Sequence, residues 1–331
     1  MSTEYVLASP GEISSRQRSF GDVPDGWARV RFHYCGLCGS DISHFEGRPG
    51  VTYPIAVGHE FVGEVVETGA GVEAISPGDV VTSDLNYRCE ECDYCRAGRS
   101  HLCRVGQQGL FTNRGFADFG DLDVSYLVPL KARPSPHLTL VEPLSCVLHA
   151  RDWAGPSAED RILVIGAGSI GLCMVIALRN HPTQPSFEVT DEMPPRLERL
   201  AAVCGSRGEA VSEPEGEFDV VFDVSGTEAG LERACRHVRG GGRLCSMSHP
   251  NGNPVSPFLV GAILRKDVTF TVSYLNGERV TMLEAARLLE HHWEPSWNEL
   301  IELIPIANLQ EAYEGRRQSP YCKTVIAVHG D

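Results

Sequence analysis

The stretch from Arg161 to Gly171 reads Arg-Ile-Leu-Val-Ile-Gly-Ala-Gly-Ser-Ile-Gly, and it decides the fold of the second half of the chain. Its first five residues form a short, largely apolar run that is typical of a buried strand. The glycine turn 166–171 follows, and a helix is predicted at 172–180. Glycines between a strand and a helix permit a tight turn and let backbone N–H groups approach a pyrophosphate at the helix N-terminus. The stretch therefore predicts a dinucleotide-binding unit.

A carboxylate follows the next predicted strand. This strand, 187–190, ends at Asp191, twenty residues beyond Gly171. An acid at this position is placed to accept hydrogen bonds from the ribose hydroxyls of adenosine, although aspartate is also a common turn residue at a strand end. Later segments continue the alternation of strands and helices, which predicts a parallel nucleotide-binding sheet. The further strands are predicted at 219–224, 243–247 and 268–274, and the segments between them include a helix at 231–239.

The first 150 residues have a different pattern. Short alternating runs such as 28–32 and 61–66 are separated by Gly, Pro and Asp, which is typical of strands joined by turns. This part of the chain predicts a compact, mostly antiparallel domain. After residue 280 the sequence predicts an amphipathic helix at 280–291 and a last strand at 322–328. Because the nucleotide sheet already has its strands, we expect these elements to return to the N-terminal domain.

Two short motifs in the N-terminal half offer metal ligands of three kinds. They are Gly36-Leu-Cys-Gly-Ser-Asp41, which contains Cys38, and Gly58-His-Glu60, which contains His59. Three protein ligands around Zn²⁺ leave a fourth position for water or substrate, as in a catalytic site. Taken alone, such a cysteine is more often a small buried hydrophobic residue, and such a histidine a core or surface residue. The rest of the chain favours the metal site.

Four cysteines form the most specific motif of the chain. Cys89, Cys92, Cys95 and Cys103 lie within fifteen residues, a spacing that lets one loop wrap a tetrahedral zinc ion. An iron–sulfur cluster also takes four thiolates, but this spacing does not match the ferredoxin motifs. Disulfides and free thiols are the remaining alternatives. We predict a closed structural zinc site in a lobe at 89–103.

Length and charge narrow the class of protein. The 331 residues are enough for two domains, and the net charge of −15 argues against binding to nucleic acid or to an anionic membrane surface. We expect a small-molecule partner. Twelve cysteines without the basic and apolar regions of a signal peptide indicate reduced thiols and a cytoplasmic location. The uncharged run 162–178 is interrupted by three glycines, so it predicts strand, turn and helix and not a membrane span.

The motifs together resemble those of the zinc-dependent medium-chain alcohol dehydrogenases, nearest to the sorbitol and other polyol dehydrogenases, over essentially the whole chain. One further motif belongs to the resemblance, Glu142-Pro143-Leu144, whose acid could on spacing alone be an ordinary helix N-terminal carboxylate. The resemblance implies an α/β fold. It divides the chain into a GroES-like catalytic domain at 1–150 with the zinc lobe, a Rossmann NAD-binding domain at 151–278 and a return to the catalytic domain at 279–331.

The resemblance also implies roles for individual residues. Cys38, His59 and Glu60 bind the catalytic zinc, Glu142 can exchange as a ligand, and Ser40 relays a proton from the substrate hydroxyl. It implies two zinc ions per chain, an alcohol or ketone substrate, and a homodimer or homotetramer. NAD is expected ahead of NADP because the negative charge of Asp191 would repel the 2′-phosphate of NADP. The positive charge of Arg196 weakens this expectation. The cofactor contacts that it implies are Gly166, Gly168, Ile170, Gly171, Asp191, Arg196, Val272 and Ser273.

Two departures from the family pattern shape the substrate prediction. The usual outer histidine of the proton route is Ser43 here, so His44 or a chain of water molecules is expected to carry the proton. The Arg-Tyr pair of the sorbitol enzymes is Ser273-Tyr274 here, which removes an anchor for an extended substrate. We therefore predict a cyclitol or aminocyclitol-like ring ahead of a linear polyol, with Tyr274, His44 and Asn276 as hydrogen-bonding groups. The alternatives are an NADPH-dependent ketone or aldehyde reductase and a non-catalytic redox-sensing scaffold.

Overall fold

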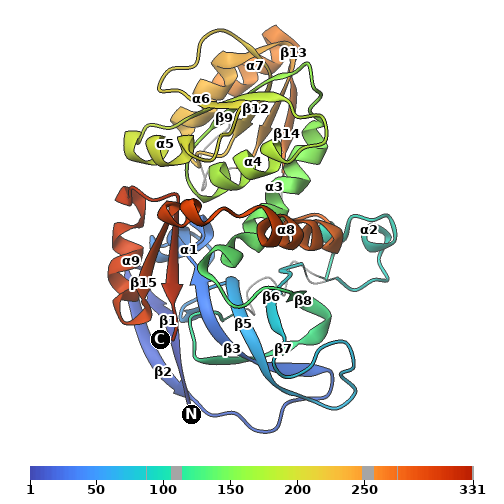
Figure 1. The fold of residues 1–331 in the computed structure, drawn as a ribbon, viewed down its shortest axis with the longest axis vertical. Helices are drawn as coiled ribbons and strands as arrows, with labels where there is room; N and C mark the ends of the chain where they lie inside the picture. Colours follow the sequence, from blue (N-terminus) through green and yellow to red (C-terminus); the bar gives the residue numbers. More distant parts are fainter. Residues whose placement is uncertain (87, 106–113, 248–256, 274, 330–331) are drawn as a thin grey trace.

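The computed structural model describes residues 1–86, 88–105, 114–247, 257–273 and 275–329, and its two principal sheets are stacked along the long axis of the molecule (Figure 1). One sheet is parallel and has six strands, and the other is mostly antiparallel and has seven. The predicted α/β class, with a β-rich part and a parallel nucleotide-binding sheet, is confirmed. Among the described helices, none is both long and apolar enough to cross a membrane.

The parallel sheet has the order β11-β10-β9-β12-β13-β14. Its central strand β9 contains the apolar run 162–165, whose four side chains are all buried. Parallel strands with both faces covered carry no polar side, which explains why this run is uninterrupted. The strands are β9 (Arg161–Ile165), β10 (Ser186–Thr190), β11 (Gly208–Ala210), β12 (Phe218–Asp223), β13 (Val238–Ser246) and β14 (Thr269–Val272). The strand predicted at 268–274 is thus shorter, and residue 274 lies outside the described residues.

The glycine turn after β9 needs its glycines for different reasons. A Cβ on Gly171 would lie 1.9 Å from the carbonyl oxygen of Gly166, so a side chain there would collide with the backbone. Gly166 itself has φ 117°, a conformation that other residues rarely adopt. A Cβ on Gly168 would meet nothing within 4 Å, which leaves its backbone open to a ligand. Helix α4 (Ser169–Arg179) begins three residues earlier than predicted, because the end of this turn is already helical.

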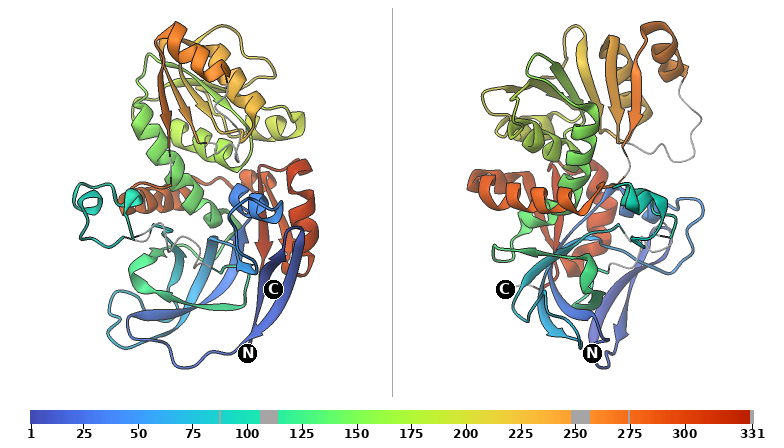
Figure 2. Two further views of the ribbon diagram at one scale, coloured as in Figure 1. Left: turned by 180° about the vertical axis from the view of Figure 1, so that it is seen from behind. Right: turned by 90° about the vertical axis from the view of Figure 1, so that its right-hand side faces the viewer.

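Helices α3 and α8 lie between the two sheets (Figures 1 and 2). Helix α3 packs against both α4 and α8, and its residues are buried nearly all round. Helix α6 begins at Glu228 and not at the predicted residue 231, because the Thr227 hydroxyl caps it by accepting a hydrogen bond from the Gly230 N–H at 3.0 Å. The helices of this region are α3 (Val141–Ala154), α4, α5 (Pro194–Ala201), α6 (Glu228–His237), α7 (Pro257–Lys266) and α8 (Arg279–His292).

The second principal sheet contains strands from both ends of the chain. Its order is β15-β16-β3-β5-β6-β8, with β7 also paired to β3, and only the β15–β16 pair is parallel. Strand β16 places Ile326 opposite Cys35 of β3, so the end of the chain lies against its beginning. The strands are β3 (Trp27–Gly36), β5 (Glu60–Thr68), β6 (Val80–Ser83), β7 (Phe119–Asp123), β8 (Leu127–Leu130), β15 (Ile301–Pro305) and β16 (Lys323–Ala327).

Smaller elements complete the β-rich part. A three-stranded antiparallel sheet has the order β2-β1-β4, and helices α1 and α9 lie beside the β-strands. The four-cysteine segment forms a lobe that projects sideways from the molecule (Figures 1 and 2). These elements are β1 (Ser2–Ser9), β2 (Glu12–Arg18), β4 (Ile55–Ala56), α1 (Gly39–Phe45), α9 (Leu309–Gly315) and, in the lobe, α2 (Asp93–Arg96) and the 3-10 turn η1 (Ser100–Leu102).

Candidate active site

The three predicted ligands of the catalytic zinc lie together in the structure. One ligand atom from each of Cys38, His59 and Glu60 lies within 4.8 Å of the other two. The antiparallel pair β3–β5 brings them together, because its register places Gly36 opposite Glu60. Ligands at about 2.0–2.3 Å from a tetrahedral zinc lie roughly 3.5 Å apart, so small side-chain rotations suffice to close this set around the ion.

Asp41 makes this site strongly anionic. One oxygen of its buried carboxylate accepts a hydrogen bond from the Cys38 N–H at 3.1 Å, and the other lies 3.7 Å from Nδ1 of His59. Burial lowers the pKa of His59, but the charges of Asp41 and Cys38 raise it more, and the net pKa lies well above the usual value. A carboxylate behind a histidine ligand fixes the ring, and surplus negative charge favours a cation. The donor set and its electrostatics thus fit Zn²⁺.

A lysine that the sequence analysis missed completes the surroundings of Glu60. The ammonium of Lys323, on β16, is fully buried; it forms an ion pair with Glu60 and donates to the carbonyl oxygen of Leu37 at 3.2 Å. A Cβ on Gly36 would lie 2.4 Å from the Glu60 carboxylate, so only glycine leaves room for this pair. The signal in the sequence was a charged residue inside the apolar strand predicted at 322–328.

Glu142 lies in the first turn of α3, close to the other ligands. Its carboxyl is buried, and burial raises its pKa to about 7, with a further increase from Glu60 and an opposing effect of His59. The thiol of Cys146, one helical turn later, donates to Glu142 at 3.5 Å. Besides Asp41, the site therefore holds two carboxylates, of which Glu60 is compensated by Lys323 and Glu142 is poised between its protonated and ionised forms.

Ser40 and His44 both lie on α1. They are four residues apart on this helix, so their side chains project from the same face. Ser40 is partly exposed, whereas His44 is buried, and burial lowers the pKa of its imidazole. The hydroxyl of Tyr53 donates to the carbonyl oxygen of His44 and fixes this end of the helix.

The predicted cofactor residues lie at the carboxyl ends of the parallel strands. Asp191 accepts hydrogen bonds from the N–H groups of Ala167, at 2.6 Å, and Met193, at 2.7 Å, so it holds the glycine turn in place. Ser273, directly after β14, donates its N–H to Ser246 at 3.0 Å, and its buried hydroxyl has no hydrogen-bond partner among the described residues. An open turn and an orphaned hydroxyl fit a bound dinucleotide.

Three further residues of the predicted cofactor site differ in their surroundings. Val272 is 46% exposed at the end of β14. The guanidinium of Arg196 donates to three backbone carbonyl oxygens, those of Ser319 at 2.8 Å, Arg317 at 3.1 Å and Arg316 at 3.2 Å. It thus ties α5 to the C-terminal segment, and its contact with adenosine stays a prediction. Ile170 lies in the first turn of α4.

The four cysteines of the lobe also lie around one point. The Sγ atom of Cys92 is 3.5 Å from that of Cys95 and 4.0 Å from that of Cys103, close to the roughly 3.7 Å expected for thiolates around zinc. These separations are far beyond a disulfide bond of about 2.05 Å. The N–H groups of Cys92 and Cys89 donate to the sulfurs of Cys89 and Cys103, at 3.3 and 3.4 Å, and such bonds stabilise thiolates. The lobe thus fits a structural zinc ion.

The chain is similar to known proteins in both sequence and fold. Residues 24–132 match the alcohol dehydrogenase GroES-like domain. The chain is 33% identical to D-altritol 5-dehydrogenase of Agrobacterium fabrum (67% of this chain, 68% of the relative) and 30% identical to D-arabinitol dehydrogenase 1 of Uromyces fabae (65% and 66%). A zinc-binding dehydrogenase of Sinorhizobium meliloti 1021, solved with NADP bound, superposes with a TM-score of 0.84 at 26% identity over 99% of both chains. The chain therefore belongs to the zinc-dependent medium-chain alcohol dehydrogenase family, among its polyol dehydrogenase-like members, and is a nicotinamide-dependent oxidoreductase of alcohols or polyols.

Proposed function

We propose that this protein oxidises a secondary alcohol group of a polyhydroxylated substrate with NAD as the hydride acceptor, and that it catalyses the reverse reduction of the ketone. The observation that carries the proposal is the meeting of Cys38, His59 and Glu60 within 4.8 Å, with Ser40 two residues beyond Cys38 on α1. The relatives that act on altritol and arabinitol support a polyol. We prefer ring-shaped substrates, cyclitols and aminocyclitols. Ser273 stands where the sorbitol enzymes have an arginine, so this anchor for an extended substrate is missing.

The chain's own residues supply the proton route. Zinc bound by Cys38, His59 and Glu60 supplies a Lewis acid that makes a hydroxyl more acidic, and nicotinamide supplies the hydride acceptor. Ser40 accepts the proton of the substrate hydroxyl. His44, one helical turn away, accepts it from Ser40, and its lowered pKa keeps the imidazole neutral and able to do so at neutral pH.

Glu142 is proposed as the exchangeable carboxylate of the site. Glu60 is held by Lys323, whereas Glu142 has a pKa raised to about 7 by burial and can change its charge at small cost. With zinc bound, a carboxyl of this kind would be able to serve as its exchangeable ligand. Two carboxylates also keep the site hydrophilic, which favours a substrate rich in hydroxyl groups.

The proposed preference for NAD has structural support. Asp191 directly follows β10 beside the glycine turn, where its charge opposes a 2′-phosphate. Arg196, the residue that would favour NADP, is engaged by three carbonyl oxygens of the C-terminal segment. The neighbour solved with NADP makes the NADPH-dependent reductase the alternative.

The first prediction concerns the metals. We expect two zinc ions per chain by elemental analysis of the purified protein. Cys38→Ser should retain one, lose activity and keep its unfolding midpoint, whereas Cys95→Ser should retain one and unfold at clearly lower denaturant concentration, because a structural zinc contributes its binding free energy to folding. One zinc ion or none in the wild-type protein would contradict the prediction.

The second prediction concerns the proton route. His44→Ala should lower kcat for alcohol oxidation roughly 10- to 100-fold, at the lower end of what a positioned acid–base group contributes. In the wild type kcat should fall as the pH drops below the usual histidine pKa and the imidazole becomes protonated, and the variant should lack this step. The neighbouring Ser43→Ala is the control. An unchanged pH profile in the His44 variant would remove His44 from the route.

The third prediction concerns substrate and cofactor. Initial rates measured by cofactor absorbance should give the highest kcat/KM for polyols, inositols or aminocyclitols with NAD, and at least about tenfold lower values with NADP, which corresponds to about 1.4 kcal/mol of charge repulsion. A site built on hydrogen-bonding groups rejects analogues that lack the hydroxyls. Higher kcat/KM for butanol or cinnamyl alcohol, or for NADPH-dependent reduction, would favour the reductase alternative.

A further inference from the structure

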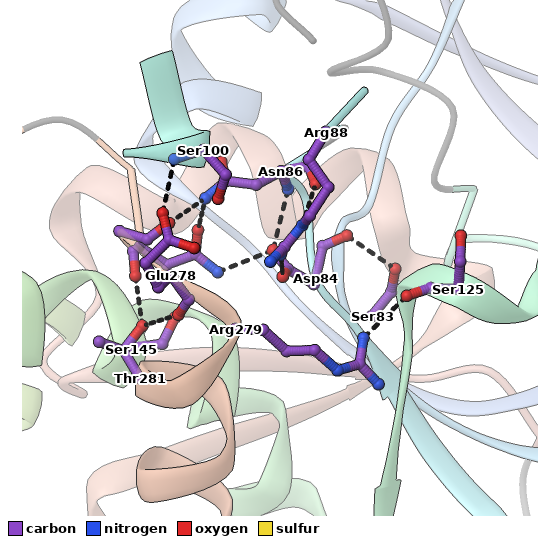
Figure 3. Close-up of polar contacts among 12 residues, drawn as sticks. Ser83, Asp84, Asn86, Arg88, Ser100, Ser125, Ser145, Glu278, Arg279 and Thr281 are labelled. Atoms are coloured by element: carbon purple, nitrogen blue, oxygen red, sulfur yellow. Dashed lines mark hydrogen bonds and ion pairs between the residues drawn. The ribbon is translucent and has the colours of Figure 1, made fainter. Parts of the chain in front are cut away.

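A buried polar network joins the four-cysteine lobe to the segment that follows the parallel sheet (Figure 3). On one side it contains residues just before the lobe and Ser100 within it, and on the other side residues that lie between β14 and α8. The partners are more than 170 positions apart in the sequence. The side chains used below are Asp84, Asn86, Asn276 and Glu278, and the backbone groups are those of Ser100 and Gly277.

The segment after β14 leads away from the cofactor site. The carboxyl ends of parallel strands form the edge at which dinucleotides bind, and β14 ends there. Ser273 follows, with its N–H bound to Ser246 and its buried hydroxyl without a partner among the described residues. Asn276 is only three residues further on. The position of the cofactor-facing end of this segment therefore depends on how residues 275–278 are held.

The turn at 275–277 is held in a conformation that it would not adopt alone. Leu275 has φ 59°, a region that a leucine rarely occupies, and such strain persists only where the surroundings fix the backbone. Gly277 has φ 64°, and a Cβ there would lie 2.7 Å from Nδ1 of His149 on α3. The turn is thus in close contact with α3, and its backbone conformation must be stabilised by contacts with other residues.

Asn276 is the first anchor, and it corrects our prediction that its side chain binds substrate. Its Nδ2 donates to Asp84 at 2.9 Å, and its Oδ1 accepts a hydrogen bond from Asn86. Asn86 also donates to the carbonyl oxygen of Gly277 at 2.9 Å. The side chains of Asp84, Asn86 and Asn276 are at most 2% exposed. These bonds connect the turn to the chain just before Cys89, the first cysteine of the lobe.

Glu278 is the second anchor. Its carboxylate accepts a hydrogen bond from the backbone N–H of Ser100 at 2.5 Å, a charge-assisted bond of the stronger kind. Ser100 begins η1, three residues before Cys103. Ser100 lies between Cys95 and Cys103 in the chain, so a zinc ion bound by these cysteines would help to hold this N–H in place. The segment just before the lobe and the turn η1 within it therefore both bind the turn 275–278.

We propose that the four-cysteine lobe is a positioning element for the cofactor, which it serves by fixing the turn 275–278 through Asn86, Asn276 and Glu278 and so the backbone at the carboxyl end of β14. This proposal rests on the nicotinamide site described above. Because coupling between two sites is reciprocal, a cofactor that binds better when the lobe is ordered must in turn stabilise the lobe.

A titration of NADH fluorescence against the zinc-loaded enzyme tests the proposal. Glu278→Ala should raise the Kd for NADH at least about fivefold, the lower range of coupling between sites, while both zinc ions are retained. Glu278→Gln, whose amide oxygen can still accept the Ser100 N–H, should restore most of the affinity. Arg104→Ala, which cuts an exposed ion pair with Asp93 within the lobe, is the control and should leave Kd unchanged.

Hydrogen exchange gives a second readout, which does not depend on the measured affinity. NADH should slow amide exchange in the peptide 89–103 of the wild type, and this protection should be lost in Glu278→Ala. If NADH binds the wild type without protecting this peptide, or binds Glu278→Ala with unchanged Kd, the lobe does not position the cofactor. Such a result overturns the inference and leaves the proposed dehydrogenase activity standing.

Discussion

The buried ion pair between Glu60 and Lys323 is the constraint on which the site depends. Both side chains are at most 1% exposed, and they come from β5 and β16, 263 positions apart. A buried charge without its partner is strongly destabilising. The packing of β5 and the packing of β16 in these positions therefore depend on each other. The proposed zinc ligand Glu60 is thus held by a residue that lies beyond the nucleotide sheet in the sequence. Gly36 gives the pair its space, since any side chain there would displace the carboxylate.

One helix then relates the metal site to the cofactor site. The N-terminus of α3 carries Glu142 beside the proposed zinc ligands, and its middle carries His149, against which the turn at Gly277 packs. The same helix lies against α4, which begins at the glycine turn. The proposed metal ligands, the glycine turn and the segment after β14 therefore all lie next to α3 or to a helix that packs on it. This arrangement accounts for its burial on nearly all sides, in contrast to a surface helix with one apolar face.

The sequence predicted those features whose physics is local. The thiolates of the lobe lie within fifteen residues, and the glycine turn lies between a strand and a helix, so spacing alone indicates what they do. Lys323 and the pairing of Asn276 with Asp84 could not be predicted in this way, because their partners are distant in the chain and nothing near them reveals the contact. The contacts of Arg196 could not be predicted either: its spacing from Asp191 suggests adenosine, which stays a prediction, but nothing near it in the chain indicates the three carbonyl oxygens of the C-terminal segment to which it donates.

A double-mutant cycle at the buried pair tests this account most directly. Urea unfolding should show that Lys323→Met loses about 3–5 kcal/mol, the cost of leaving a buried carboxylate unpaired, and that adding Glu60→Gln recovers a large part of the loss. The coupling between the two positions is the decisive quantity. If the two substitutions act additively, or if Lys323→Met unfolds at the same urea concentration as the wild type, the pair does not hold the site together.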